Sequence, residues 1–497
     1  MSNYVIGIGG TGAKCVEAFV HMVAAGLVNP SDRAKDISVL LIDPDVANGS
    51  LERARSTLQK YREVRTVPSV GRIAFLRDGL EPVDRQKSQW AWSPFADEAN
   101  PSFQRRFTYA GMGVLEAGLL DVLYTDAEKK ASLRKGFLGR PSIGAAVMAE
   151  ILDLDDPDLE EPWKGLSNRL KNDKDPKVFI VGSIFGGTGA SGMPTVARLL
   201  ADFMSTSEIR IGCALVLPYF SFPAPDAQQA QQVQARAEEF LLRSQAALSY
   251  YQSKLSEDRD IYDAVYLLGT DDLPQVENNS LGSKEQRNPP HYLELYAATA
   301  ALHFFEQQLN DPVRTHIIRS PGVCLNWSQL PGGKVTEYSL ANLARFSYAY
   351  LGYFYKELLN PAELQRKKAP WFGLFFKKER LSEIEVSLKK VRDYCELFLV
   401  WLKDTQSFSG NCQVDLFRTD TYRVEADSEG NKRVSILKDE YIRLYAVESS
   451  QSRLVPNTFL DIKVALDRLT PEQSVGASDV GCFIHALYKL CSPKKEL

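Results

Sequence analysis

The sequence predicts an α/β protein: a doubly wound parallel sheet, then a long helix, then a second α+β domain with a helical C-terminal extension. Two observations carry this prediction. Short, almost continuous apolar runs such as Ser38–Ile42 and Lys177–Ser183 are typical of strands buried on both faces of a parallel sheet. These runs alternate with helix-like segments, and two strands end in a glycine cluster directly before a helix.

Composition excludes several other classes. The chain has 497 residues, enough for two to four domains of about 150 residues each. Hydrophobic residues make up 44% and charged residues 25%, which excludes disordered, collagen-like and coiled-coil proteins. The net charge of -4 indicates no nucleic-acid partner. The seven cysteines form no C-x-x-C and the five histidines show no metal-ligand spacing, so no disulfide framework or directly bound metal is assigned.

A cytoplasmic location is expected. The N-terminus, MSNYVIGIGG, lacks the basic and then apolar pattern of a signal peptide. No run of about 18 apolar residues suggests a membrane-spanning helix, and membrane contact is not expected.

The first domain is predicted to cover residues 1–287. It starts with a strand at Tyr4–Ile8, a helix at Ala13–Ala25 and the strand at Ser38–Ile42. Residues 50–135 have no clean period, and helices are placed near Leu51–Arg65 and Met112–Lys130. The remaining elements are strands at Lys177–Ser183, Ile209–Leu217 and Tyr262–Leu268, and helices at Pro194–Met204 and Ala227–Lys254.

A helix at residues 288–308 is predicted to join the first domain to the second. Proline stands at its start, where the missing N–H does no harm. The second domain, residues 309–497, is predicted to hold short strands, a helix near Tyr338–Tyr355, helical residues 360–405 and strand-like residues 411–450.

The first glycine cluster runs from Gly7 to Gly12. A strand that ends in glycines lets the backbone approach a phosphate, and the N–H groups of the next helix then bind the anion. We interpret Gly9, Gly10, Thr11 and Gly12 as such a loop; a tight strand–helix turn is the alternative. The loop is not a Walker A motif, because Ala and Lys follow Gly12.

The second cluster also follows a buried strand and opens a helix. It comprises Gly186, Gly187, Thr188, Gly189, Ala190 and Ser191. Two such loops in one domain are a much stronger signal than one. A Rossmann dehydrogenase needs only the first, whereas a triphosphate gripped from two sides would use both.

With these loops the chain resembles the tubulin/FtsZ superfamily, whose hallmark is a G-G-G-T-G-[ST]-G loop. Phe185–Gly192 matches it with Ala190 inserted, and the resemblance extends over about residues 4–310. It implies that Asp43 and Asp45, after the second strand, form the acidic loop beside the nucleotide and its Mg²⁺.

The resemblance also assigns two further segments. Gly139, Arg140, Ser142 and Gly144 resemble the G-x-N-P-x-x-G loop that contacts the γ-phosphate, with Arg140 where the family has asparagine. The segment from Pro218 to Phe222 resembles the P-F-x-F segment near the ribose, which implies contacts from Pro218 and Phe222.

Base recognition is implied at the start of the helix at 288–308. In the family an aromatic ring stacks on guanine and a polar side chain bonds its N1 and N2 edge; Tyr292 and Glu294 match these roles. A carboxylate can accept from both donors of guanine, a pair that adenine lacks. The alternative is that Tyr292 belongs to the core and Glu294 is a solvated charge at the helix start.

Hydrolysis in the family is completed by a neighbouring subunit, through acids in an N-x-D-x-x-[DE] loop. The nearest match here is Val335–Leu340, in which Glu337 takes the first acid position, Leu340 the second, and the asparagine is missing. The resemblance therefore implies slow hydrolysis with Glu337 as catalytic residue. The alternative for Glu337 is a charge at a helix N-terminus near Thr336.

We therefore expect a divergent prokaryotic tubulin-like protein that binds GTP or GDP with Mg²⁺ and self-associates head-to-tail into cytoskeletal filaments. Any partner proteins are expected to bind through the C-terminal domain. One alternative is a Rossmann-type NAD(P) oxidoreductase, with Asp43 on the ribose hydroxyls. The others are a non-polymerising, nucleotide-holding scaffold, and an adaptor in which both glycine loops are empty turns.

Overall fold

A computed structural model describes most of the chain. The described residues are 2–27, 36–70, 75–85, 87–96, 98, 100–137, 139–151, 154, 160–204, 209–221, 237–255, 261–276, 287–307, 314–320, 322–376, 381–417, 419–426, 432–437, 458–470 and 479–492. Within them, no helix combines the length and the apolar character needed to cross a bilayer.

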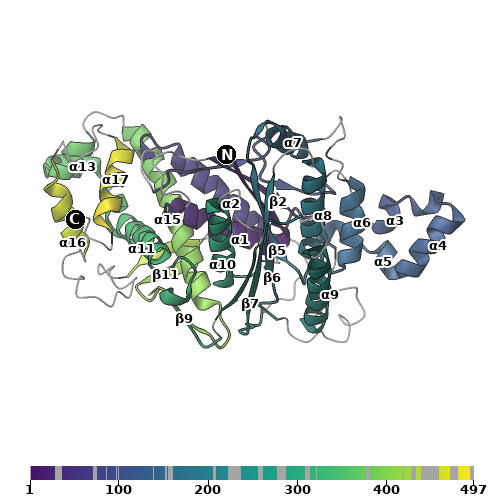
Figure 1. The fold of residues 1–497 in the computed structure, drawn as a ribbon. Coiled ribbons are helices and arrows are strands. Elements are labelled where there is room, and N and C mark those ends of the chain that lie inside the picture. Colours follow the sequence, from purple (N-terminus) through teal and green to yellow (C-terminus); the bar gives the residue numbers. More distant parts are fainter. Residues whose placement is uncertain are drawn as a thin grey trace.

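One parallel sheet runs through the molecule (Figure 1), in the strand order β3-β2-β1-β5-β6-β7-β8, and β4 also pairs with β2. The strands are β1 (Asn3–Ile8), β2 (Asp36–Ile42), β3 (Gly79–Pro82), β4 (Ala91–Trp92), β5 (Lys177–Ser183), β6 (Arg210–Val216), β7 (Ala264–Thr270) and β8 (Arg314–Ser320). Gly7 of β1 lies opposite Leu41 of β2 and Val181 of β5. The predicted doubly wound parallel sheet is confirmed.

Helices cover both faces of the sheet. One face carries α1 (Gly9–Ala24), α2 (Gly49–Arg65) and α10 (Leu293–Glu306), and the other carries α6 (Pro141–Ile151), α7 (Trp163–Asn172), α8 (Gly187–Phe203) and α9 (Ala237–Leu255). Because successive strand residues point to opposite faces, Val5 joins the core under α1 while Tyr4 and Ile6 join the core under α8. This explains why the strands read as continuous apolar runs.

The helix expected at residues 288–308 is shorter in the structure. α10 has 14 residues, because residues 287–292 are not helical and the Nδ1 of His291 accepts a hydrogen bond from the Leu293 N–H. β8 then extends the main sheet from residues beyond the predicted domain boundary. The division into domains stays a prediction.

The C-terminal half is largely helical and packs on the α1/α2 face (Figure 1). Its helical segments are α11 (Gly333–Ala349), a π-helical turn (Tyr350–Phe354), α12 (Tyr355–Leu358), α13 (Pro361–Arg366), α14 (Pro370–Phe375), α15 (Leu381–Ser407), α16 (Phe459–Asp467) and α17 (Val480–Leu490). Two small sheets pair β9 (Cys324–Asn326) with β10 (Gln413–Asp415), and β11 (Tyr422–Ala426) with β12 (Lys432–Ile436). The second α+β part and its helical extension are confirmed.

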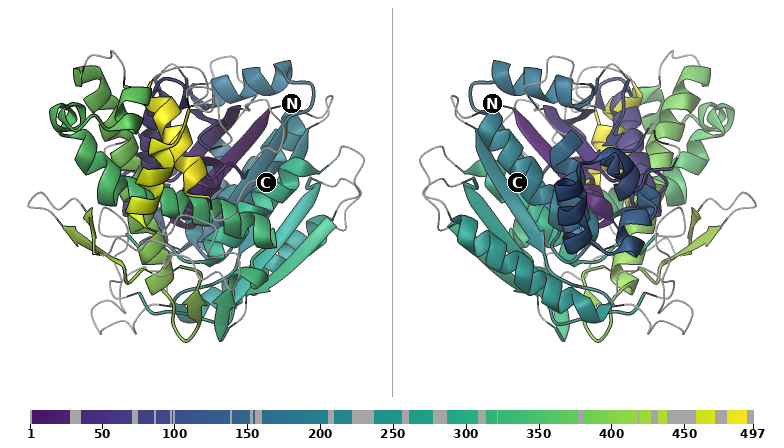
Figure 2. Two further views of the ribbon diagram at one scale, coloured as in Figure 1. Left: turned by 90° about the vertical axis from the view of Figure 1, so that its left-hand side faces the viewer. Right: turned by 90° about the vertical axis from the view of Figure 1, so that its right-hand side faces the viewer.

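Residues 103–130 form a small lobe that projects away from the sheet beyond α6 (Figures 1 and 2). It holds α3 (Phe103–Arg106), α4 (Val114–Leu123) and α5 (Asp126–Lys130). The single helix expected near Met112–Lys130 is broken, because Thr125 forms a capping box with Glu128 that starts a new helix. A 3₁₀ turn (Leu133–Lys135) leads from the lobe back to the sheet.

Candidate functional site

The two glycine loops meet where the sheet changes its winding direction. β1 and β5 pair along their whole length, and the chain leaves β1 into α1 on one face and β5 into α8 on the other. Ligands of open α/β sheets bind at such a switch point, outside the carboxyl ends of the strands.

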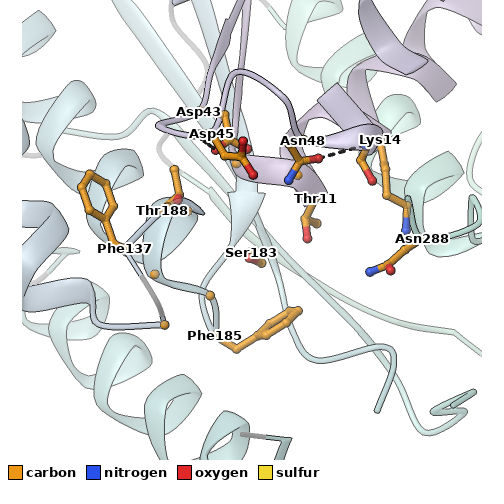
Figure 3. Close-up of a pocket in the computed structure, with 18 of the residues that line it drawn as sticks. Thr11, Lys14, Asp43, Asp45, Asn48, Phe137, Ser183, Phe185, Thr188 and Asn288 are labelled. Carbon is orange, nitrogen blue, oxygen red and sulfur yellow. Dashed lines mark hydrogen bonds between the residues drawn. The ribbon is translucent and has the colours of Figure 1, made fainter. Parts of the chain in front are cut away.

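A cleft with an empty volume of about 910 Å³, part of it open to solvent, lies at this point (Figure 3). It is lined by Gly9, Gly10, Thr11, Lys14, Asp43, Asp45, Asn48, Ser50, Lys135, Gly136, Phe137, Gly139, Ser183, Phe185, Gly186, Gly187, Thr188, Gly189, Tyr219, Phe220, Phe240 and Asn288.

Two helix N-termini border the cleft without side-chain caps. Ile8 before α1 and Gly186 before α8 make no capping hydrogen bond, and neither first turn holds an acidic residue. The neighbouring α2 differs, since Asn48 caps it by accepting from the N–H groups of Ser50 and Leu51. α1 and α8 therefore offer N–H donors and the positive ends of two helix dipoles to an anion.

The glycines let the two loops touch each other and the strands. A Cβ on Gly9, whose φ is +73°, would lie 3.4 Å from the Cβ of Thr188. A Cβ on Gly12 would lie 2.5 Å from the carbonyl oxygen of Val181 on β5, too close for a side chain. Gly12 therefore serves the packing of α1 on the sheet, while Gly9, Gly10 and Thr11 line the cleft.

A third loop lies on the second glycine loop. A Cβ on Gly187 would be 3.0 Å from the backbone nitrogen of Gly139 and 3.1 Å from the Cβ of Phe137. Gly136 and Gly139 both have positive φ, +89° and +70°. This loop also brings the exposed Lys135 to the rim of the cleft.

The other residues predicted for the third loop stand behind the cleft. The Arg140 guanidinium pairs with Glu128 at 3.2 Å, while Ser142 and Gly144 lie within α6. Gly144 packs closely on Ser191 of α8, and the Ser191 hydroxyl donates to the carbonyl oxygen of Gly187 at 2.7 Å. These contacts support the second glycine loop rather than line the cleft.

Two buried carboxyl groups follow β2 at the cleft. Asp43 is 3% exposed and Asp45 4%, and the Asp45 N–H donates to Asp43 Oδ1 at 3.0 Å. Burial raises the pKa of Asp43 to about 7, and the charge of Asp45 acts in the same direction. A cation beside the two carboxylates would offset both the cost of burying their charge and the repulsion between them. In proteins Mg²⁺ is held by one or two carboxylates together with phosphate oxygens and water, so Asp43 and Asp45 fit this ion.

Within the described ranges, no group of three or more His, Cys, Asp or Glu residues could hold a metal ion. The remaining ligands of a Mg²⁺ ion would therefore come from the bound phosphates and from water.

The raised pKa of Asp43 predicts a pH-dependent stability. An aspartate in an unfolded chain has a pKa of about 3.9, so between about pH 4 and pH 7 only the folded state holds this proton. The free energy of unfolding should therefore fall as the pH rises through this range. Urea denaturation of the ligand-free protein measures the slope, which Asp43→Asn should flatten. An equal slope in both proteins would contradict the prediction.

The opposite end of the cleft is aromatic. Phe185, Phe220 and Phe240 form one cluster, with ring centroids 4.7 Å apart for Phe185–Phe240 and 5.6 Å for Phe185–Phe220. Lys14 and Asn288 lie at the same end (Figure 3). Flat apolar surface beside a few polar groups is what an aromatic base requires.

Glu294 and Tyr292 lie behind this end of the cleft and are not among its lining residues. The Lys14 ammonium is 2.6 Å from Glu294 Oε1 and donates to the Tyr219 hydroxyl at 3.0 Å. Both members of the ion pair are at most 2% exposed. Burial lowers the pKa of Lys14 and raises that of Glu294, and the attraction between them opposes both changes. The Tyr292 hydroxyl shares a hydrogen bond with Thr270 Oγ1 at 3.0 Å.

The remaining predicted residues are placed as follows. Ala190 lies in the first turn of α8, Pro218 stands two residues after the end of β6, and neither lines the cleft. Phe222 lies outside the described residues. Glu337 is half-buried in α11, away from the cleft lining.

Sequence reasoning missed several residues that line the cleft: Lys14, Lys135, Phe240 and Asn288. Only Lys14 carried a usable signal. It stands two residues after Gly12, so the second turn of α1 places it near the loop. Asn288, Lys135 and Phe240 belong to no motif, whereas Phe185 and Phe220 lie in the segments Phe185–Gly192 and Pro218–Phe222 that resemble motifs of the family.

Comparisons with known proteins add little to this picture. No protein-family model matches the chain, and no curated protein matches it. Among solved structures, a match is the GTPγS-form protofilament of TubZ from Bacillus thuringiensis serovar israelensis, with 12% sequence identity and a TM-score of 0.26. The match covers 62% of this chain and 56% of that chain. A likeness this distant carries no argument about function.

Proposed function

We propose that the chain is a tubulin/FtsZ-like protein that binds GTP or GDP with Mg²⁺ in this cleft and assembles head-to-tail. One observation carries the nucleotide part: two uncapped helix N-termini border the same cleft as two buried carboxyl groups. N–H donors bind phosphate, and carboxylates hold the Mg²⁺ that phosphates chelate. A polyphosphate with its cation satisfies both parts.

We assign the phosphate groups of the nucleotide to the two glycine loops in turn. Gly9, Gly10 and Thr11 would bind the α- and β-phosphates through the start of α1, and Gly186–Gly189 the β- and γ-phosphates through the start of α8. Lys135, on the rim formed by the third loop, would reach the terminal phosphate. Mg²⁺ would neutralise part of the phosphate charge when bound.

The base is assigned to the aromatic end. A purine ring would pack on the cluster of Phe185, Phe220 and Phe240, facing Lys14 and Asn288. An ammonium group donates to the O6 and N7 acceptors of guanine, whereas adenine carries an amino donor at C6. We therefore assign the preference for guanine to Lys14 and Asn288, with Glu294 acting through its ion pair with Lys14.

Assembly and hydrolysis rest on the resemblance. Glu337 lies outside the cleft lining, so we propose that it meets a nucleotide only across a contact between subunits. A single acid in that position implies slow hydrolysis. A head-to-tail contact is heterologous and leads to a filament unless the rotation closes a ring.

Sedimentation with GTP, with GDP and without nucleotide tests the assembly. We expect filaments, visible by electron microscopy, only with GTP and Mg²⁺. Glu337→Gln should still sediment but release phosphate at least about tenfold more slowly, as expected for loss of a group that positions water. Monodisperse particles at high protein concentration would contradict assembly, and a large oligomer without nucleotide would indicate a scaffold.

A further inference from the structure

The lobe at residues 103–130 exposes an unusual amount of apolar surface. Five large side chains of α4 are between 60% and 90% exposed: Val114, Leu115, Leu119, Val122 and Leu123. The lobe stands clear of the rest of the molecule (Figure 1; facing the viewer in Figure 2, right). Scattered exposed leucines need no explanation, but an apolar patch on one short helix indicates an interaction surface.

All five side chains belong to one face of α4. At 3.6 residues per turn, positions 114, 115, 118, 119, 122 and 123 spread over about 180°, one half of the helix circumference, with Gly118, Leu119, Val122 and Leu115 nearest its middle. Leu120 packs inward against the core beneath α6 and α8. The inner side of α4 therefore already contacts the core, whereas its apolar outer face is exposed to solvent.

The two charged residues of α4 are already engaged within the lobe. Glu116 accepts a hydrogen bond from the Gly113 N–H at 2.7 Å. Asp121 pairs with Lys129 and accepts from the Tyr109 hydroxyl at 2.6 Å. Covering the apolar face would thus bury no unpaired charge of this helix, which removes the main electrostatic cost of docking.

The sequence of this face is close to a palindrome. Val114-Leu115 and Val122-Leu123 stand at equal distances from the central pair Gly118-Leu119. If a second α4 is laid antiparallel across a two-fold axis at the centre, each Val-Leu pair meets the opposite Val-Leu pair. Leu119 then enters the space over Gly118, where an added Cβ would meet nothing within 4 Å. A face that complements itself is what an isologous contact requires.

We propose that a second copy of this chain covers α4, through antiparallel α4–α4 packing about a two-fold axis. The five side chains expose on the order of 600 Å² of apolar surface, so a symmetric pair would bury at most about 1,200 Å² of it, the lower end of the range for stable interfaces. No residue of α4 lines the cleft, so we expect the contact to form without nucleotide.

A symmetric disulfide tests the two-fold axis directly. In Gly118→Cys the two introduced thiols lie near the axis, within reach of a disulfide across closely packed helices. Mild oxidation should convert most of this variant into a covalent dimer. Gly373→Cys is the matched control, since Gly373 is also an exposed helical glycine with nothing within 4 Å of an added Cβ. The native cysteines are buried or half-buried and should react little.

Sedimentation velocity of the reduced protein completes the test. Without nucleotide, the wild type should be a dimer and Leu119→Arg a monomer with an unchanged circular dichroism spectrum, because Leu119 is 60% exposed and the fold does not depend on it. A monomeric wild type, equal cross-linking of the two cysteine variants, or a dimer that survives Leu119→Arg would overturn the proposal. Binding of the monomeric wild type to lipid vesicles, lost in Leu119→Arg, would assign the face to a membrane and overturn it as well.

Discussion

Gly10→Asp is expected to abolish nucleotide binding while the protein stays folded. The new carboxylate would stand in the first turn of α1, where the cleft offers N–H donors to phosphate. A negative charge there favours the helix, because it interacts with the positive end of the dipole, yet it repels the phosphates. We expect the affinity for GTP to fall at least about 100-fold, which is about 3 kcal/mol. Isothermal titration calorimetry measures this loss.

Gly10→Asn is the matched control. A Cβ at this position has room, with its nearest neighbour the Asn48 amide nitrogen at 3.4 Å, and asparagine has nearly the shape of aspartate without its charge. The asparagine variant should therefore retain much more affinity than the aspartate variant. Equal losses in the two variants would mean that shape rather than charge is at issue, and would contradict a phosphate at this position.

Lys14→Met is expected to destabilise the fold strongly. The variant leaves Glu294 buried without its partner at 2.6 Å, and breaking a buried ion pair costs about 3–5 kcal/mol. Urea denaturation at neutral pH measures the free energy of unfolding. The loss should shrink at acidic pH, where Glu294 takes up a proton. A loss below about 1 kcal/mol would contradict the burial of the pair.

The double variant Lys14→Met/Glu294→Gln separates stability from recognition. Removing both charges should restore most of the stability, since no buried carboxylate is left unpaired. If Lys14 reads the base, the folded double variant should still bind GTP through its phosphates but lose its preference for GTP over ATP. A preference that persists would move base selection to Asn288 or to the aromatic cluster.

Periodicity and the glycine clusters were enough to predict five strands of the sheet, β1, β2, β5, β6 and β7, and the two glycine loops that line the cleft. Neighbouring residues of a strand enter the cores on opposite faces of the sheet, as Val5 and Ile6 of β1 do. Both must therefore be apolar, and the resulting apolar run can be recognised from the sequence alone. Each glycine cluster follows its strand directly, so pairing β1 with β5 brings Gly9 against Thr188.

The arrangement at the aromatic end of the cleft could not be predicted, because it depends on contacts between distant segments. Glu294 stands near the start of α10, where a carboxylate free to bind the base was expected. The Lys14 ammonium of α1 instead lies 2.6 Å from Glu294 Oε1 and forms an ion pair with it. Lys135 reaches the rim through a 3₁₀ turn and two positive-φ glycines, for which no periodic pattern exists.

Calorimetric titration of the nucleotide-free protein with GTP, ATP and NAD in the presence of Mg²⁺ tests the central claim most directly. We expect GTP to bind with a micromolar or lower dissociation constant, and ATP and NAD to give no heat at the same concentrations. Binding of NAD alone would contradict the account and move the site to the first glycine loop and Asp43. The absence of all binding would contradict it equally, since both glycine loops would then be empty turns.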